Sequence, residues 1–436
     1  MNTTFNHRLW RRAISTALLG TLLISATPAA GARPEPAADA AVIANWNEIA
    51  VNTITKPVAQ GGRGANSESF LWYAFVHAAM YNAVVGITHE YELYKWHVRG
   101  PAIASPQAAA AVAAHDVLME YFGANAAIAA SLDASLQASL DQIPDGVSET
   151  LGIRYGERAA DRLIELRADD GRFAPVVFNP PQPLAPGVWR PTPPANAPFF
   201  DPWMGQLEPL LLDSASQFRP GPPPAIASDL YVTEFNEVRD YGSKTSAVRT
   251  IEQTNLALFV NDIPVIPIQA ALRDLVDRRD LDISASARLF AAVDLSIADA
   301  IIATWDGKLV YGWWRPITAI READTDGNPV TVGVPGWEPL INTPPYPDWP
   351  SGLSGEVGAI SATLSRLNAD GRVDLTITSP ATGITRHYDD GEDLQQDVIH
   401  ARVWSGIHFH TADVVGAAMG VEVGNWALDH YFAPSK

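Results

Sequence analysis

The sequence predicts an all-α protein with two helical bundles, a long proline-rich crossing between them and few short strands. Apolar residues recur at helical spacing through most of the chain. Between the two helical regions, fifteen prolines fall within residues 175–224, a density that excludes helix and central strand. The chain has no cysteine, so its stability must come from a large core, for which a hydrophobic content of 47% suffices.

The first 32 residues have the features of a secretory signal peptide. Arg8, Arg11 and Arg12 precede an apolar run over residues 13–26, and an A-x-A cleavage site ends at Ala32. The run is too short for a membrane anchor. We therefore expect a secreted or extracytoplasmic protein, residues 33–436, exported by the Sec route or, given the paired arginines, by the twin-arginine route.

The net charge restricts the partners of the exported chain. Removal of the signal leaves 27 basic residues (30 less three) against 49 acidic ones, a net charge of −22. Such a surface repels nucleic acid and anionic membranes, so neither is expected as a partner. A few cations that converge in a pocket can still bind an anion.

Three regions divide the exported chain. Helices are expected in residues 41–174, where His77 and His115 are expected to be hydrogen-bonded core residues. Residues 175–226 form the crossing, whose aromatic residues favour an ordered segment or a pocket rim over a flexible linker. Residues 227–436 form the second bundle, with helical patterns in 228–279, 284–314, 354–368 and 394–431 and a strand or hairpin in 371–393.

Two cations in the second bundle, Lys308 and Arg315, have a spacing that suits anion binding. Seven residues on a continuous helix would bring them to within about 20° on one face, two turns and ~10 Å apart. Long side chains at these positions can close on one anion from two sides. A solvated basic face is the alternative.

A second segment, Pro350-Ser351-Gly352, opens a helical pattern. A helix N-terminus offers unpaired N–H groups, Ser351 adds a hydroxyl, and Gly352 lets an anion approach the backbone. The alternative is an ordinary serine N-cap.

A third segment contains Arg402 and His408. Their spacing places them on different faces of a straight helix, so both can face one ligand only if the chain bends, and Ser405-Gly406 is the expected point. An arginine binds oxyanion oxygens, and a neutral histidine nitrogen can bond to phosphorus or to a metal.

Three motifs therefore occur in order: Lys308-x6-Arg315-Pro316, Pro350-Ser351-Gly352 and Arg402-x5-His408. The combination resembles the signature of the vanadium-dependent haloperoxidases and of the type 2 phosphatidic acid phosphatase superfamily to which they belong. Flanking segments such as GIHFHTADVVG are similar to the secreted bacterial branch, and the likeness runs from about residue 41 to the end. The resemblance implies two four-helix bundles.

The resemblance also implies a role for each motif residue. His408 would be the covalent ligand of the vanadate metal, or the phosphohistidine nucleophile of a phosphatase, with Arg402 and Lys308 as catalytic partners. The residues implied to hold the cofactor oxygens are Lys308, Arg315, Ser351, the Gly352 N–H and Arg402. Trp305 and Tyr346 would flank a halide pocket. Vanadate is the implied cofactor, and phosphate could occupy the same site.

Leu353 departs from the family pattern, which continues Pro-Ser-Gly-His. That histidine provides acid–base assistance, which is worth roughly 10²–10⁴-fold in rate. His387, His400 and His410 are the local candidates to replace it. Candidate acidic partners of the imidazole and the cations are Asp413, Asp306 and Glu252.

Three functions are compatible with this pattern. The first is a vanadate-dependent haloperoxidase-like enzyme that oxidises halide with hydrogen peroxide, its activity reduced by Leu353. The others are a phosphatase that acts on phosphoesters or pyrophosphates through His408, and an isomerase, cyclase or binding protein that uses the same pocket. The expected partners are hydrogen peroxide, halide and an organic acceptor, and a second copy of the chain is compatible with the sequence.

Overall fold

Thirteen α-helices and one two-stranded hairpin make up most of the regular structure of residues 36–180 and 183–436, which the computed structural model describes. The all-α prediction is confirmed. The compact unit is Pro36–Lys436. The predicted signal peptide, residues 1–32, lies outside the described residues.

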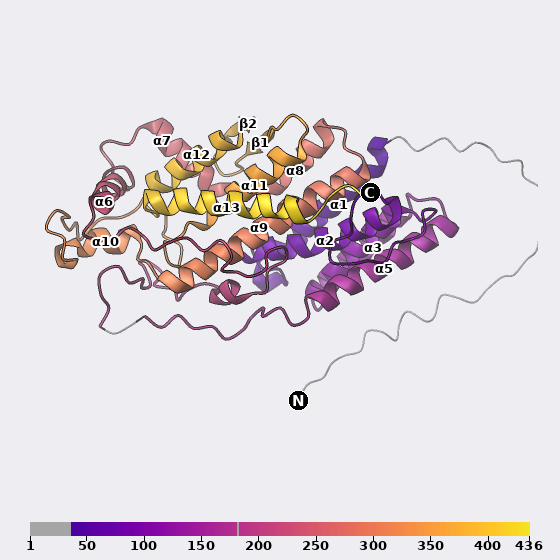
Figure 1. The fold of residues 1–436 in the computed structure, drawn as a ribbon, viewed down its shortest axis with the longest axis horizontal. Helices are drawn as coiled ribbons and strands as arrows, with labels where there is room; N and C mark the ends of the chain where they lie inside the picture. The colour runs from indigo at the N-terminus through magenta and orange to yellow at the C-terminus, as the bar shows by residue number, and fades with distance from the viewer. Residues whose placement is uncertain (1–35, 181–182) are drawn as a thin grey trace, which may run out of the picture. The chain divides into compact units, whose positions relative to one another are not determined.

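Five α-helices precede the crossing (Figure 1): α1 Pro36–Ile54, α2 Glu68–Thr88, α3 Pro106–Phe122, α4 Ala126–Leu140 and α5 Val147–Leu166. The helical spacing of apolar residues in the sequence predicts four of these five helices clearly. In α4 only Ile128 and Leu132 are buried, so this helix has no broad apolar stripe for a sequence pattern to show.

The remaining elements follow the crossing: α6 Asp229–Tyr241, α7 Ile251–Asp262, α8 Ile266–Arg278, α9 Ile283–Tyr311, α10 Pro316–Glu322, α11 Gly352–Leu367, β1 Leu375–Thr378, β2 Thr385–Tyr388, α12 Gly391–Trp404 and α13 His410–His430. Short 3₁₀ turns lie at Val58–Gln60, Pro202–Gln206 and Ala323–Thr325. The hairpin predicted within residues 371–393 is confirmed, with Leu375 opposite Tyr388.

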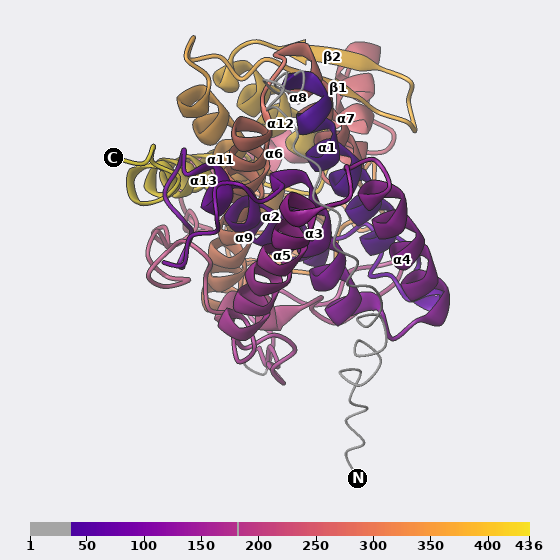
Figure 2. The ribbon, with the colours of Figure 1, turned by 90° about the vertical axis from the view of Figure 1, so that its right-hand side faces the viewer.

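The two groups of helices share one core through α9. This helix packs against α2 on one side and against α11 and α13 on the other (Figures 1 and 2). It is buried almost throughout, and one hydrophobic cluster extends from α1 to α13. α2 is long and apolar enough to cross a membrane, but its most apolar stretch is entirely buried in the protein. It is therefore explained as a core helix.

The proline-rich crossing is ordered where the structure describes it. No α-helix lies between α5 and α6 in its described residues. Asp299 on α9 accepts hydrogen bonds from the N–H groups of Leu210, Leu211 and Leu212, at 2.7, 2.7 and 2.8 Å. Trp203 is buried. These contacts fix the crossing along α9, where it can border a pocket.

The core contains polar side chains that are paired. His77 is buried, and its Nδ1 bonds the carboxylate of Asp294 on α9. His115 bonds Asp116 and Asp133 through its two ring nitrogens. The prediction that both histidines are hydrogen-bonded core residues is confirmed.

The prediction of one continuous helix through Lys308 and Arg315 is wrong. α9 ends at Tyr311 because Gly312 takes a left-handed conformation, with φ of 50°. Pro316 then begins α10 and keeps Arg315 extended, at φ −87° and ψ 155°. Both cations nevertheless approach the ring of Tyr346, although a break in the helix separates them.

The predicted bend between Arg402 and His408 is confirmed, and it divides the last helical block into α12 and α13. Gly406 has φ of 79°, and a Cβ at this position would lie 2.4 Å from the backbone oxygen of Gly242. Only glycine suits both the conformation and this close approach.

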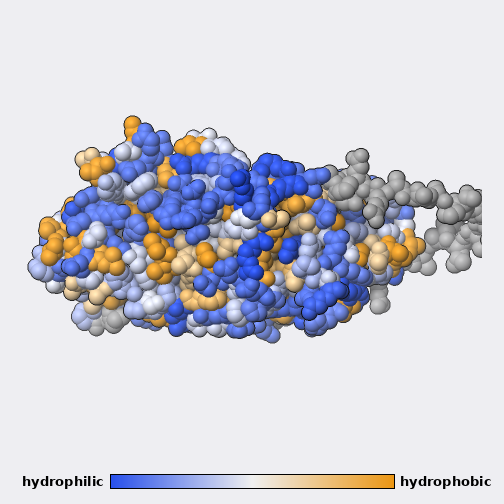
Figure 3. Space-filling view, turned by 45° about the horizontal axis from the view of Figure 1, so that its top comes forward, coloured by the Kyte–Doolittle hydropathy of each residue, from blue (hydrophilic) through white to orange (hydrophobic). Residues whose placement is uncertain are grey.

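Hydrophilic side chains dominate the surface face in Figure 3, with hydrophobic ones scattered among them. This distribution gives no sign of a broad apolar surface on that face.

Candidate functional site

The predicted oxyanion residues meet at one buried point. Lys308 lies near the end of α9, Ser351 caps α11, and Arg402 and His408 lie on either side of the break between α12 and α13. Lys308 and Ser351 are fully buried, and Arg402 is 6% exposed. Arg315, from the turn before α10, places its Nη1 3.0 Å from His408 Nε2. The fold thus collects three cations and a histidine from distant segments.

His408 is held on its other side by Asp348. The two residues approach to 2.7 Å between His408 Nδ1 and Asp348 Oδ1, and both are buried. Because Nε2 faces the N–H donor of Arg315, the neutral ring carries its proton on Nδ1, toward Asp348. Burial and the neighbouring cations hold the pKa of His408 well below its usual value. The imidazole is therefore neutral and suited to act as a ligand or nucleophile.

Asp348 is the site residue that the sequence analysis missed. It lies three residues before Ser351 in PDWPSG, so a carboxylate beside an anion motif was the available signal. The carboxylates proposed from sequence are placed differently. Asp306 pairs with Arg219 at 2.6 Å, Glu252 is exposed on α7, and Asp413 accepts a hydrogen bond from Ser354 at 3.0 Å.

Several buried donors in the site have no acceptor. Arg315 donates from Nε to the Tyr346 carbonyl and from Nη1 to the Ile407 carbonyl, but its Nη2 has no partner among the described residues. The same holds for Arg402 Nε, whereas Ser351 Oγ lies beside the carboxyl group of Asp413 without a well-aligned hydrogen bond. Ser351 therefore does not use its hydroxyl as an ordinary N-cap. Because buried donors are normally paired, this set suits an acceptor that the protein does not itself provide.

Lys308 makes a different set of contacts. Its Nζ donates to the carbonyls of Pro347, Asp348 and Pro350, at 2.7, 3.1 and 2.6 Å. Burial, followed by the charge of Arg315, places its pKa well below the usual value. In this structure Lys308 braces the segment before Ser351 and contributes its charge to the site.

The aromatic pair predicted beside the site is in contact with the cations. The rings of Trp305 and Tyr346 lie 4.9 Å apart. Lys308 Nζ is 5.2 Å and Arg315 Cζ is 4.9 Å from the Tyr346 ring centre. These distances are in the range of cation–π attraction, so Tyr346 helps to hold both charges in place.

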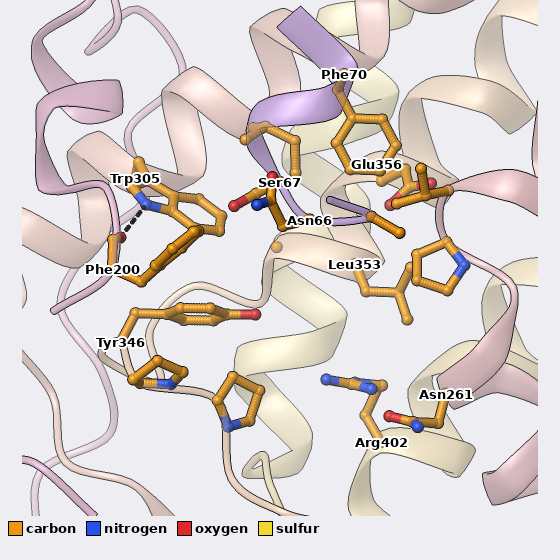
Figure 4. Close-up of a pocket in the computed structure, with 17 residues that line it drawn as sticks. Asn66, Ser67, Phe70, Phe200, Asn261, Trp305, Tyr346, Leu353, Glu356 and Arg402 are labelled. Atoms are coloured by element: carbon orange, nitrogen blue, oxygen red, sulfur yellow. Dashed lines mark hydrogen bonds between the residues drawn. The ribbon is translucent and has the colours of Figure 1, made fainter. Parts of the chain in front are cut away.

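A pocket of about 500 Å³ leads to this point (Figure 4). Gly352, Tyr346 and Arg402 border it at the site, and Leu353 projects into it from α11. The remaining wall is mainly apolar and aromatic, and includes Phe70, Phe200, Ile301, Trp305 and Val265. The pocket can therefore hold an organic molecule beside the buried donors.

Residues 288–434, which contain the three motifs, match the model of the second helical-bundle domain of vanadium chloroperoxidase. This segment of the chain is similar to the vanadium haloperoxidases. It is 30% identical over 170 residues to the vanadium chloroperoxidase of Curvularia inaequalis, a match that covers 28% of this chain and 27% of that protein. The chain thus matches about a quarter of the length of this relative.

Two solved structures show that the likeness in fold extends beyond the matched domain. A bacterial vanadium-dependent iodoperoxidase has a TM-score of 0.73 and 23% identity, and the match covers 91% of this chain and 96% of that one. A bacterial vanadium-dependent chloroperoxidase in its holo form has a TM-score of 0.67 and 18% identity, with 86% and 94% covered. At these identities the likeness concerns the fold.

The residues of this site are suited to vanadate, the oxyanion of the metal for which the similar proteins are named. Vanadate is a compact oxyanion, and the unpaired Arg315 Nη2 and Arg402 Nε are suited to its oxygens, to which the Ser351 hydroxyl can also donate. Gly352 begins α11, so its N–H has no acceptor within the helix. The neutral His408 offers Nε2, where a ligand would take the place of the contact with Arg315 Nη1.

No histidine lines the pocket around Leu353 in the described part of the chain. His387 is exposed on β2. His400 stacks on Trp404, and His410 faces Glu237 at 3.1 Å. None of the three candidates thus lies where Leu353 stands in place of the histidine of the Pro-Ser-Gly-His pattern.

Two buried carboxyls give the site a dependence on pH. Burial raises the pKa of Asp348 to about 8 and that of Asp413 to about 7. Both groups are neutral below these values and become negative as the pH rises through them. Sulfate affinity is therefore expected to fall by roughly ten-fold or more between about pH 6 and about pH 9, because deprotonation places negative charge beside the hydrogen-bond donors that hold the anion.

Calorimetric titration with sulfate measures this effect, since sulfate keeps a constant charge over the range. Asp413→Asn removes one of the two ionisations and should flatten the lower part of the curve, because Asp413 has the lower pKa of the two. A constant or rising affinity with increasing pH would exclude this electrostatic account.

Proposed function

We propose that this chain is a vanadate-dependent haloperoxidase-like enzyme that oxidises halide with hydrogen peroxide, at a rate reduced by Leu353. The observation that carries the proposal is the convergence of buried, unpaired donors on a neutral histidine at the inner end of an apolar pocket. Such an arrangement binds a compact oxyanion and keeps bulk water away from it.

Different residues would hold different parts of the vanadate group. His408 Nε2 would bond the metal while Asp348 holds the ring at Nδ1. Arg315 Nη2, Arg402, Ser351 Oγ and the Gly352 N–H are the groups that would take its oxygens. Bound vanadate supplies the Lewis acidity that makes hydrogen peroxide electrophilic toward a halide. Trp305 and Tyr346 provide a desolvated wall against which the halide would lie.

The reduced rate follows from the chemistry of the side chain at position 353. Leucine can neither donate nor accept a proton, whereas peroxide chemistry requires proton transfer. The site therefore retains its means of anion binding while it lacks the family's means of proton transfer at this position. Binding of vanadate is expected to be strong relative to turnover.

The test combines vanadate loading with a bromination assay. After incubation with vanadate and dialysis, elemental analysis should find about one vanadium per chain. Bromination of monochlorodimedone should require both bromide and hydrogen peroxide. His408→Ala is the control and should lose both the vanadium and the activity. Turnover no higher than in this variant would remove the haloperoxidase proposal.

Two other outcomes would redirect the proposal. Hydrolysis of p-nitrophenyl phosphate with a trapped phosphohistidine at His408 would indicate a phosphatase, because phosphate can use the same donors. Anion binding without either reaction would favour an isomerase, a cyclase or a binding protein. Export from the cytoplasm and the use of small-molecule partners belong to the same proposal, and rest on residues 1–32 and on the acidic composition.

A further inference from the structure

A second acidic group, Glu356, borders the pocket that leads to the oxyanion site. It lies on α11 three residues after Leu353, so the two side chains share one face of the helix. Figure 4 shows both beside the pocket, with Arg402 on the far side of Leu353. Glu356 is 1% exposed. A protonatable group thus lies one helical turn from the position where the family pattern has histidine.

No hydrogen bond or close ion pair in the described part of the chain stabilises a negative charge on Glu356. Its Oε1 is buried without a hydrogen bond, and no described residue forms an ion pair with its carboxyl group within 4.0 Å. An ionised carboxylate in such surroundings is costly, whereas a neutral carboxylic acid is tolerated. Burial accordingly raises the pKa of Glu356 well above its usual value, against the opposing charge of Arg402.

The charged groups around Glu356 are few. Arg402 on α12 favours its ionised form, and Asp294 on α9 favours its neutral form. The other polar groups that line the pocket are uncharged: Asn66, Ser67, Asn261 and Tyr346. On α13, which also packs against α11, Asp413 is bonded to Ser354. Arg402 is therefore the group best placed to stabilise the carboxylate after Glu356 gives up its proton.

We infer that Glu356 holds a proton and supplies it to molecules in the pocket, a task that Leu353 cannot perform. The inference rests on the proposed function. Oxidation of a halide by hydrogen peroxide to hypohalous acid and water consumes one proton. Glu356 would give that proton to the departing hydroxide, which leaves as water, and the carboxylate would take a proton from solvent before the next turnover.

Glu356→Gln tests the inference, because glutamine keeps the shape of the side chain and cannot release a proton. Infrared difference spectra of wild type against the variant should contain the carbonyl stretch of a protonated carboxyl group at neutral pH. Bromination by the vanadate-loaded variant should fall by roughly 10²-fold, while its sulfate affinity stays within about three-fold of wild type. The pH profile of kcat should lose one ionisation.

Glu68→Gln is the matched control. Glu68 is also a buried glutamate close to the pocket, but its Oε1 accepts a hydrogen bond from Trp72 at 3.0 Å. This variant should keep both the rate and the pH profile. Glu356→Asp should regain part of the activity, because it restores a carboxyl group on the same helix face.

Two results would overturn the inference. The first is a difference spectrum with carboxylate bands alone, and the second is a Glu356→Gln enzyme with unchanged rate and pH profile. Failure of the proposed function looks different. In that case the wild-type protein itself does not brominate after vanadate loading, and the infrared bands still show whether Glu356 holds a proton.

Discussion

Leu353→His is expected to raise the bromination rate of the vanadate-loaded protein by roughly 10²–10⁴-fold, the usual contribution of a positioned acid or base. Leu353 follows Gly352 in the first turn of α11 and projects into the pocket beside Arg402. An imidazole there would lie next to the hydrogen-bond donors that bind the oxyanion. It would add proton transfer without removing any group that binds the oxyanion. Steady-state bromination rates over a range of peroxide concentrations measure the effect.

Leu353→Met is the control for a change of side chain at this position. It keeps an apolar group of similar size and should leave the rate within a few-fold of wild type. If the histidine variant binds vanadium but gains no activity, the pocket has been adapted to another reaction. That result would favour an isomerase, a cyclase or a binding protein.

Arg402→Met is expected to separate anion binding from stability. The guanidinium is buried, and no described residue forms a hydrogen bond or ion pair with it, so its role in the fold is small. Its loss should weaken vanadate binding by about 2–5 kcal/mol, or roughly 30-fold to several thousand-fold. The free energy of unfolding without anion should stay the same or rise, because an unpaired buried charge is removed.

The opposite pattern is expected for Arg219→Met. Arg219 forms two hydrogen bonds to Asp306, at 2.6 and 2.7 Å, and lies on the crossing. Its loss should lower the free energy of unfolding by about 1–3 kcal/mol, because Asp306 is left without its partner. Vanadate affinity should change little. Denaturant unfolding and calorimetric titration of both variants give the comparison, and equal losses of stability would contradict it.

The sequence predicted the helical fold because most helices bury a regular apolar face. It also predicted the bend at Ser405-Gly406, since Arg402 and His408 could not otherwise face one ligand. The prediction of one helix through Lys308 and Arg315 was wrong for a related reason. Both a continuous helix and a break at Gly312 can bring the two cations together, so the functional argument could not choose between them.

The sequence could not predict the contacts of individual side chains. Asp348 lies beside His408, sixty residues along the chain, because the Pro347–Pro350 segment contacts Lys308 and the Asp348 N–H donates to the Trp313 carbonyl. Whether Arg315 Nη2 and Ser351 Oγ form hydrogen bonds within the protein likewise depends on the positions of all their neighbours. A motif identifies which residues take part, whereas the tertiary structure decides which of their atoms remain free.

The pocket takes its walls from several parts of the chain. Residues 65–67 and Phe70 come from the first helical group, Phe200 from the crossing and Val265 from the segment before α8, whereas every predicted oxyanion residue lies between Lys308 and His408. Part of the wall that meets an organic molecule is consequently encoded outside the stretch that binds the anion. Variation in those outer segments, in nature or in the laboratory, can change which molecules enter while the anion-binding residues stay the same.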